Sequence, residues 1–359
     1  MAVAWGAGTN STINPNNNDY GQSLVPANLT NAVEVAGGYS LSFALCADGT
    51  ITNWGDDVLG DNHFPQTNIF QEVSCGYLHS LGLETNGTVM AVGDDEYGQI
   101  EVPGGLTNAV SVACGWYHSL ALKSDGTVSA WGGEGSINYG QGTVPDGISN
   151  VVAISGGAYF DLALKSDGTI FAWGDNTYGE TDVPAGLSNV VAIAAGGYHA
   201  LALTAKGTVA AWGFNDFGQT NVPAGLSNVV AIAAGGWHSM ALKSNGTVAA
   251  WGLNVSGQTN VPASLTNVMQ IAGGLNNSLA LVGNGPLPTH AVLTGAAFTT
   301  NGFRVSLPTQ YGRVYQLVYK NALTDGTWQW LPLHTGTGTN VLLTDPAVTP
   351  RRFYEALRW

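Results

Sequence analysis

A motif that combines glycine, an aromatic residue and His-Ser-Leu-Ala-Leu recurs along the chain, and its spacing limits the fold more than any other feature. Its glycines follow one another in steps of 38 to 42 residues, at Gly38, Gly76, Gly115, Gly157, Gly196, Gly235 and Gly274. Sixteen residues after each of the first six comes a second landmark, usually Ala-Trp-Gly, at Trp54, Val92, Trp131, Trp173, Trp212 and Trp251. A fixed period of this length is typical of propellers and solenoids.

The two landmarks of the repeat, the glycine motif and Trp-Gly, are not paired at the two ends of the array. No Trp-Gly follows the seventh glycine, Gly274, at the expected distance, whereas Trp5-Gly6 stands alone at the start of the chain. A ring whose last blade is completed by the N-terminal strand explains both observations, and an open array would leave two unpaired edges. The sequence therefore predicts an all-β fold, a seven-bladed β-propeller closed by its N-terminal strand.

Each repeat has the alternation of small and β-branched residues that is typical of short strands. One copy predicts strands at residues 190–194, 199–203 and 208–212, followed by an outer segment at residues 219–223 as the fourth strand of the blade. The repeat is lost after residue 285. We expect a propeller at residues 1–285 and a small C-terminal β domain, resembling a sandwich, at residues 286–359, with a linker at 284–288 and about five strands, at residues 303–307, 314–319, 328–333, 341–343 and 353–357.

The repeated residues resemble a known family. Gly-x-x-His-Ser-Leu-Ala-Leu followed by Asp-Gly-Thr-Val-x-Ala-Trp-Gly is similar to the regulator-of-chromosome-condensation repeat, over about residues 1–285. That resemblance implies a seven-bladed propeller, in agreement with the independent count. The Gly-Gln-Thr-x-Val-Pro segments that begin at Gly218 and Gly257 are most similar to propeller-type β-lactamase inhibitory proteins, which implies an inhibitor of an extracellular enzyme as one function.

The binding surface is expected at one end of the ring. In an antiparallel blade the turn after the repeat glycine and the loop after Trp-Gly emerge at the same end. These segments carry aromatic residues and carboxylates, which are typical of interfaces. The candidate contact residues, four of which (Tyr117, Tyr159, Tyr198 and Trp237) also follow from the resemblance, are Tyr77, Trp116, Tyr117, Tyr159, Tyr198, Trp237, Asp94, Asp95, Asp175 and Asp216. A purely structural packing of these rings is the alternative.

Catalytic and metal signatures are missing from the sequence. There is no HExxH, GxSxG, phosphate-binding loop or paired zinc-ligand pattern, so we expect no catalytic residue, no cofactor and no metal. The repeated histidines, His79, His118, His199 and His238, are predicted to be structural hydrogen-bonding groups. Three cysteines without CxxC spacing are expected to be small buried residues.

Charge limits the class of partner. The net charge of −14 argues against nucleic acid, because few cations are present to neutralise phosphates. No apolar run is long enough to span a membrane. We expect a monomeric, non-enzymatic protein-binding scaffold; the alternatives are a carbohydrate- or cell-surface-binding module and a hydrolase or lyase acting from the acidic loops. The low lysine content favours a bacterial protein that is secreted, periplasmic or on the cell surface.

Overall fold

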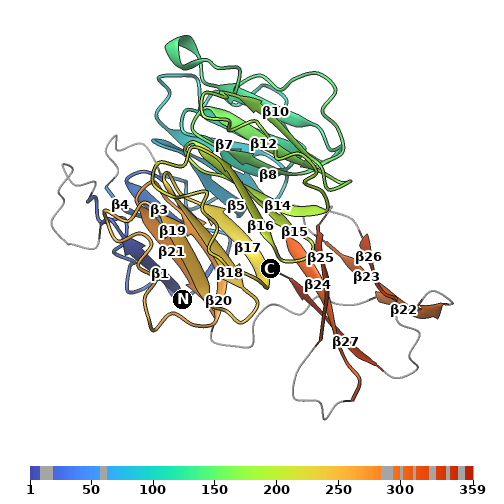
Figure 1. Cartoon of the computed structure of the whole chain (residues 1–359). Helices are drawn as coiled ribbons and strands as arrows, with labels where there is room; N and C mark the ends of the chain where they lie inside the picture. Colours follow the sequence, from blue (N-terminus) through green and yellow to red (C-terminus); the bar gives the residue numbers. More distant parts are fainter. Residues whose placement is uncertain are drawn as a thin grey trace.

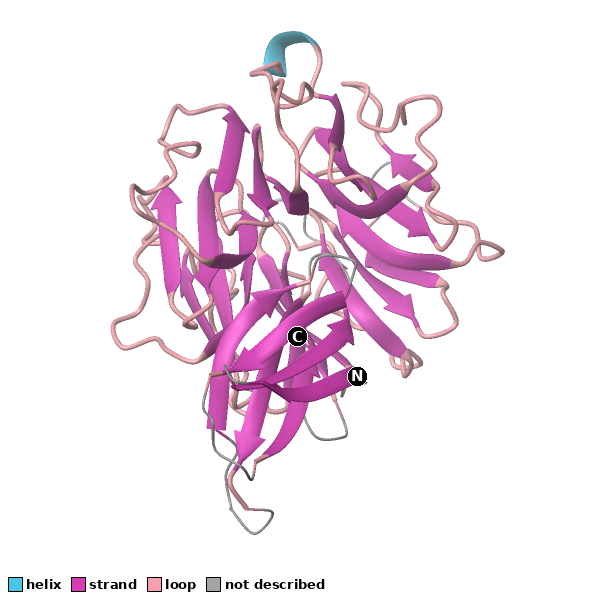
Figure 2. Cartoon of the chain, turned by 90° about the vertical axis from the view of Figure 1, so that its right-hand side faces the viewer, coloured by secondary structure: helices cyan, strands magenta, loops and turns pink. Residues whose placement is uncertain are grey.

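Strands dominate the computed structural model of the chain (Figures 1 and 2). The structure describes residues 1–8, 19–56, 63–283, 294–299, 302–309, 313–322, 329–336, 340–346 and 352–358. Its one helical segment among these residues is a short 3-10 turn, η2 (Gly135–Ile137). No helix in the described ranges has the length and apolar character needed to cross a membrane.

The repeats form antiparallel sheets of three strands. Within the described residues there are seven such sheets before residue 283, with the orders β1-β21-β20, β2-β3-β4, β5-β6-β7, β8-β9-β10, β11-β12-β13, β14-β15-β16 and β17-β18-β19. The strands are β1 (Ala2–Gly6), β2 (Ala32–Gly37), β3 (Leu41–Cys46), β4 (Ile51–Gly55), β5 (Phe70–Cys75), β6 (His79–Glu84), β7 (Val89–Gly93), β8 (Ala109–Cys114), β9 (His118–Lys123), β10 (Val128–Gly132), β11 (Val151–Gly156), β12 (Phe160–Lys165), β13 (Ile170–Gly174), β14 (Val190–Ala195), β15 (His199–Thr204), β16 (Val209–Gly213), β17 (Val229–Ala234), β18 (His238–Lys243), β19 (Val248–Gly252), β20 (Val268–Gly273) and β21 (Asn277–Val282).

The N-terminal strand completes the last sheet, as the sequence predicts. β1 pairs antiparallel with β21, with Trp5 opposite Ser278 and Ala2 opposite Leu281. Two backbone bonds between Met1 and Val282, each 2.7 Å long, extend this pairing by one residue. Because the two ends of the repeat array share a sheet, the array is a closed ring and its edges are paired.

The predicted fourth strand of each blade is wrong. Every propeller sheet in the described part of the chain has three strands, and the segment Gln219–Pro223 forms turns outside them. Pro223 has no N–H to give to a ladder. The Gln219 side chain is fully buried and accepts a bond of 3.1 Å from the Phe217 N–H, so it folds the segment back on itself.

Neighbouring blades are joined by the landmark tryptophans. Each indole N–H donates to the backbone carbonyl of a buried Gln or Glu in the preceding repeat: Trp54 to Gln22, Trp131 to Gln99, Trp173 to Gln141, Trp212 to Glu180, Trp251 to Gln219 and Trp5 to Gln258, over 2.8–3.3 Å. All six tryptophans are buried. The conserved spacing of the repeat therefore fixes how one blade sits against the next.

The C-terminal residues form two further three-stranded sheets, with the orders β22-β23-β26 and β25-β24-β27. Their strands are β22 (Thr294–Thr299), β23 (Gly302–Pro308), β24 (Val314–Lys320), β25 (Gln329–Thr335), β26 (Asn340–Asp345) and β27 (Phe353–Arg358). Side chains from both sheets, including Phe303, Val305, Leu317 and Leu343, make one core, as the sandwich prediction requires. The sequence interpretation missed β22, whose alanine and glycine give little strand signal, and the predicted linker lies outside the described residues.

The C-terminal sheets pack on the ring at the end that carries the lysine turns. The Leu333 N–H donates to the Ala205 carbonyl over 3.0 Å, and Val314, Val318 and Leu333 join the core of blades β14–β19. Both cartoon views place these sheets far from the loop that contains η2 (Figures 1 and 2). The loops at the opposite end are therefore left uncovered by the C-terminal sheets.

Candidate functional site

Two sets of loops meet at one end of the ring. The residue after each Trp-Gly donates its N–H to the carbonyl of the residue two after the repeat glycine, as Asp94 does to Leu78, Asp175 to Tyr159 and Phe214 to Tyr198, over 2.8–2.9 Å. This backbone bond recurs from blade to blade. It holds the aromatic turns against the acidic loops, as the sequence predicts.

The side chains of these loops form a continuous group of rings, named here the aromatic belt. It consists of Tyr20, Tyr39, Tyr77, Tyr97, Trp116, Tyr117, Tyr139, Tyr159, Tyr178, Tyr198, Phe214, Phe217 and Trp237, each within 6.4 Å of another member between ring centroids. All six aromatic candidates from the sequence are members.

Trp116 contacts aromatic rings from several blades of the aromatic belt. Its ring lies 5.6 Å from Tyr77, 5.5 Å from Tyr198 and 6.1 Å from Trp237, so it connects blades that are not neighbours. The stacked pair Tyr198–Trp237, with centroids 5.1 Å apart, continues the belt. Rings packed in this way hold one conformation and can bind without a large loss of side-chain entropy.

Exposure increases from the centre of the belt to its rim. The inner rings such as Tyr77 and Trp237 are half-buried, whereas Tyr139, Tyr178 and Phe217 are 51%, 50% and 45% exposed. Burial, followed by neighbouring charges, raises the pKa of Tyr117 to about 12, so its hydroxyl keeps its proton at physiological pH. The belt is thus an apolar surface that carries tyrosine hydroxyl groups.

The predicted carboxylates lie on the loops beside the belt. Asp94 accepts a bond of 2.9 Å from the Gln99 amide, Asp95 accepts one of 3.1 Å from the Ile100 N–H, and Asp175 accepts one of 2.6 Å from the Thr177 hydroxyl. Asp216 is exposed. Three of the four predicted aspartates therefore also order their own loops.

Seven rings of the belt, Phe214 and Tyr20 among them, are not on the list of candidates from the sequence. Phe214 directly follows Trp212-Gly213 and could have been found from the position of Asp94 and Asp175 in their repeats. Tyr20 comes from the first repeat, whose longer loop hides its register; its hydroxyl is 2.9 Å from that of Tyr39. Ser40 and Asn276, which replace aromatic residues in their repeats, are buried and interrupt the ring of aromatics.

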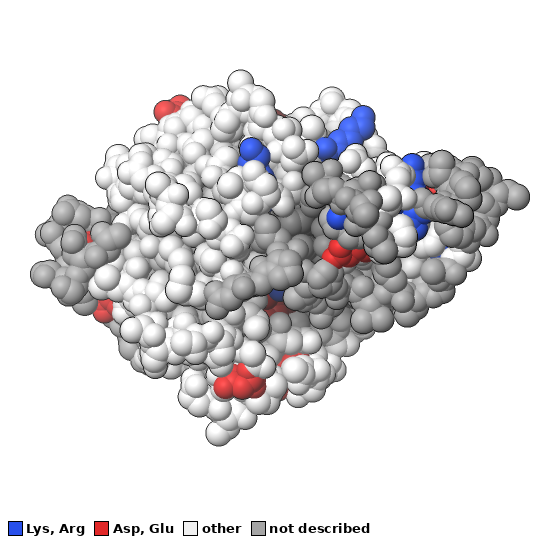
Figure 3. All heavy atoms as spheres, turned by 90° about the horizontal axis from the view of Figure 1, so that it is seen from below, with Lys and Arg blue, Asp and Glu red and all other residues white. Residues whose placement is uncertain are grey.

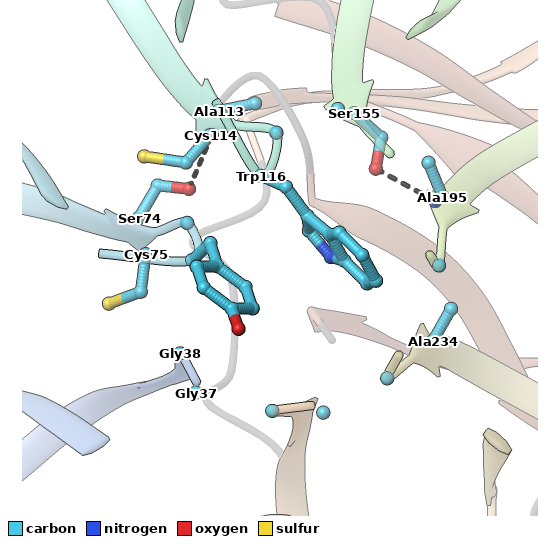
Figure 4. A pocket seen from close by; sticks show the side chains of 18 of the residues that line it. Gly37, Gly38, Ser74, Cys75, Ala113, Cys114, Trp116, Ser155, Ala195 and Ala234 are labelled. Atoms are coloured by element: carbon cyan, nitrogen blue, oxygen red, sulfur yellow. Dashed lines mark hydrogen bonds between the residues drawn. The ribbon is translucent and has the colours of Figure 1, made fainter. Parts of the chain in front are cut away.

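A cavity of about 260 Å³ runs along the axis of the ring below Trp116. Glycines, alanines and small polar residues of the inner strands line it, and the indole of Trp116 points into it (Figure 4). Ser74 accepts a bond of 2.9 Å from the Cys114 N–H, and Ser155 accepts one of the same length from the Ala195 N–H (Figure 4). These serines connect one inner strand to the next.

The other end of the axis carries charge. Glu34 and Glu72 occupy the same position in successive repeats, and the Arg313 guanidinium from the C-terminal part lies 2.7 Å from Glu34. Burial, with the nearby Glu34 carboxylate, raises the pKa of Glu72 to about 8 despite the bond of 2.8 Å that it accepts from Ser111. A positive side chain of the C-terminal segment therefore meets a carboxylate of the propeller here.

The repeated histidines are structural, as predicted. Nε2 of His79, His199 and His238 lies 2.9–3.0 Å from the serine hydroxyl of the next blade, and that of His118 lies 2.7 Å from Asp161. Burial lowers the pKa of His79 and His199 to about 3 and that of His238 to about 4, so these rings are neutral. Each ring also covers its repeat glycine, where a Cβ would lie 2.0–2.5 Å from an imidazole carbon.

The other chemistry-bearing residues are not gathered into a site. Cys46, Cys75 and Cys114 are free thiols, and burial raises the pKa of the last two. In the part of the chain that the structure describes, no group of three or more His, Cys, Asp or Glu side chains is placed to hold a metal ion.

Comparison with known proteins identifies the repeat. The regulator of chromosome condensation (RCC1) repeat matches at residues 70–99, 109–141, 151–180, 190–219 and 229–258. The comparison with curated proteins found no match. The five matched segments correspond to the blades from β5 to β19, and the remaining two propeller sheets follow from the repeat spacing and from the ring itself.

Solved structures with the same architecture include two of Prp20 from yeast. The chain is 18% identical to Prp20p of Saccharomyces cerevisiae, described with its binding to Gsp1p and histones, at a TM-score of 0.62 that covers 78% of this chain and 90% of that one. The chain is 20% identical to yeast RCC1 (Prp20) bound to Kap60, at a TM-score of 0.63 that covers 78% of this chain and 88% of that one. It is 23% identical to the ectodomain of the Physcomitrella patens receptor kinase CR4, at a TM-score of 0.59 that covers 76% of this chain and 78% of that one. The sequence matches and the shared fold agree that this protein is a β-propeller of the RCC1-repeat type.

Proposed function

We propose that the protein is a non-enzymatic scaffold that binds a protein partner through the aromatic belt. The observation that carries this proposal is the exposure of Tyr139, Tyr178 and Phe217, which extend a continuous aromatic surface that the C-terminal sheets leave uncovered. Contiguous apolar surface with a polar rim is typical of protein interfaces. Tyrosine and tryptophan are enriched among the few residues that carry most of the binding energy in such interfaces.

The packing of the rings favours a protein over a carbohydrate. Tyr198 lies between Tyr159 and Trp237, and Tyr117 lies between Tyr77 and Tyr159, with centroids 5.1–6.0 Å apart. Tyr198 stacks on Trp237 and Tyr117 stacks on Tyr159, so each of these inner rings has a face covered by its neighbour. A sugar needs a wide free face, and exposed ring surface remains mainly at the rim, on residues such as Tyr178. A carbohydrate ligand is therefore the second candidate, and a glycan array is its test.

The fold supports binding in general but not one partner. Prp20 is described with protein partners, Gsp1p, histones and Kap60, and its likeness to this chain is a likeness of fold. Inhibition of a β-lactamase, or of another extracellular enzyme met by an exported bacterial protein, is one specific form of the proposal. A panel of β-lactamases titrated with the protein tests it, and activity that is unchanged at micromolar concentration would exclude this form.

The general proposal is tested with a partner captured from the native host and identified by mass spectrometry. We expect Trp237→Ala and Tyr178→Ala to weaken its binding by about thirtyfold each, the effect of losing an interfacial hot spot. Lys165→Ala, on a turn at the opposite end, is the control and should leave the affinity unchanged. Equal affinity of all three variants and the wild type would refute the aromatic belt as the binding surface.

A further inference from the structure

The aromatic end of the ring carries negative charge without any positive charge. Its loops contain carboxylates, and the sequence places no Lys or Arg in any of them; the acidic residues include Asp94, Asp95, Glu96, Glu134, Asp175, Asp182 and Asp216. The lysines lie at the opposite end of the ring. Lys123, Lys165 and Lys243 are the last residues of β9, β12 and β18, and Lys206 lies in the turn that follows β15. Figure 3, which views the molecule from below, shows Lys and Arg side chains as well as carboxylates on that side.

The carboxylates are close to the rings of the belt. Burial and then the carboxylate of Glu96 raise the pKa of Tyr97, and Asp94 contributes to the same shift. The pKa of Tyr159 is raised mainly by burial, and the Asp175 carboxylate adds to it. The Gln99 side chain links one such pair, because it accepts a bond of 2.8 Å from the Tyr97 N–H and donates one of 2.9 Å to the Asp94 carboxylate.

We propose that the partner contacts the loops of blades β5 to β19 with an arginine-rich protein segment. This inference rests on the proposed function and adds the chemistry of the partner. A guanidinium stacks on an aromatic face and also binds carboxylate oxygens in a fork, and it loses less hydration than an ammonium ion. The negative potential of the loops attracts such a segment and repels an acidic one.

The position of the rings selects arginine over a purely ionic contact. Tyr97 and Tyr117 lie 5.3 Å apart, edge to face, beside the loop of Asp94 and Glu96. Tyr178 lies on the same loop as Asp175, and Phe217 directly follows Asp216 in the sequence; both rings are about half exposed. Each of the two places offers an aromatic ring and a carboxylate to the same planar cation.

The experiment uses a fluorescent peptide of alternating arginine and serine, with the full-length protein and anisotropy as the readout. The test variant carries Asp95→Asn, Asp175→Asn and Asp216→Asn. The control variant carries Asp48→Asn, Asp125→Asn and Asp167→Asn, which remove the same charge from turns at the opposite end.

We expect both variants to keep their loops. Asp175 accepts from Thr177 the same pair of bonds that Asp125 accepts from Thr127, and Asp216 is exposed. Asn245 occupies the control position in its own repeat and accepts the same two bonds from Thr247 that Asp125 accepts from Thr127. Asn215 and Asn254 occupy the position of Asp95 in theirs, and each accepts a backbone N–H bond there. A loss of affinity in the test variant therefore reports the charge and not the fold.

We expect the test variant to bind the peptide about tenfold more weakly and the control variant to lose less than twofold. Trp237→Ala should also weaken binding, and a peptide with citrulline in place of arginine should not bind. Equal losses in the two triple variants, or equal binding of the citrulline peptide, would overturn the inference. A captured partner that needs Trp237 but ignores the test substitutions would refute the arginine-rich partner alone and leave the proposed function intact.

Discussion

Replacement of Trp5 by alanine tests whether the N-terminal strand holds the ring closed. Trp5 is 5% exposed and packs in the core of the last blades beside Ala280. Its indole N–H donates to the Gln258 carbonyl over 2.9 Å. That carbonyl also accepts a bond of 2.8 Å from the Ser278 hydroxyl, so the substitution does not leave it unpaired.

The expected cost follows from these contacts. Truncation of a buried tryptophan to alanine costs about 3–5 kcal/mol, which includes about 1 kcal/mol for the lost hydrogen bond. With an unfolding entropy of about 2 cal/mol/K per residue, a ring of this size should melt about 5–8 °C lower. Removal of residues 1–6 should cost more, because it also exposes the edge of β21.

The assay is thermal unfolding followed by calorimetry, with Trp251→Ala as the matched control. Trp251 is the equivalent residue of the neighbouring blade, 8% exposed, with the same bond to the Gln219 carbonyl. We expect the two alanine variants to melt within about 2 °C of each other. If Trp251→Ala lowers the melting temperature and Trp5→Ala leaves it unchanged, the closing strand contributes nothing and the reasoning fails.

Two further predictions concern pH. The buried His199 has a pKa of about 3, so the unfolded state binds a proton that the folded state does not, and stability falls as pH drops below about 6.5, by about 2 kcal/mol for this group by pH 5. His199→Asn, which imitates Asn277 in its bond to a neighbouring hydroxyl, should reduce the loss of melting temperature between pH 7 and 5; an unchanged loss would contradict this. The pKa of Glu72, about 8, makes stability depend on pH in the opposite direction. The stability that its neutral carboxyl contributes is complete below about pH 4.5 and is lost as pH rises through 8. Glu72→Gln should therefore melt higher than the wild type at pH 9 and equally at pH 4, and a lower melting temperature at both would refute the assignment.

Repetition made most of the fold predictable from the sequence. The seven glycines gave the order of the strands, and the isolated Trp5 predicted a pairing between residues more than 270 positions apart. Strand bounds in the tested copy agree within one residue, since β14, β15 and β16 begin at 190, 199 and 209. The fourth strand was wrong because one buried side chain, Gln219, replaces the ladder bonds that the strand would have made.

The site was predictable in part, for a related reason. Residues at equal positions in equal repeats must lie at the same end of the ring, so Tyr117, Tyr198 and Trp237, each two residues after a repeat glycine, could be placed together. Contacts between unlike segments follow no such rule. The meeting of Arg313 with Glu34 depends on how the C-terminal sheets pack on the ring, and nothing in either segment signals the other.

The direction of β1 also determines on which side of the ring a label or tether at the N-terminus would lie. Met1 pairs with Val282 at the end of β21, so the first residue leaves the ring on the side where the C-terminal sheets are packed. A label or tether added before Met1 would therefore hang from the back of the disc. If the protein is immobilised through its N-terminus, the tyrosines and tryptophans of the aromatic belt would face the solution and remain accessible to a macromolecule.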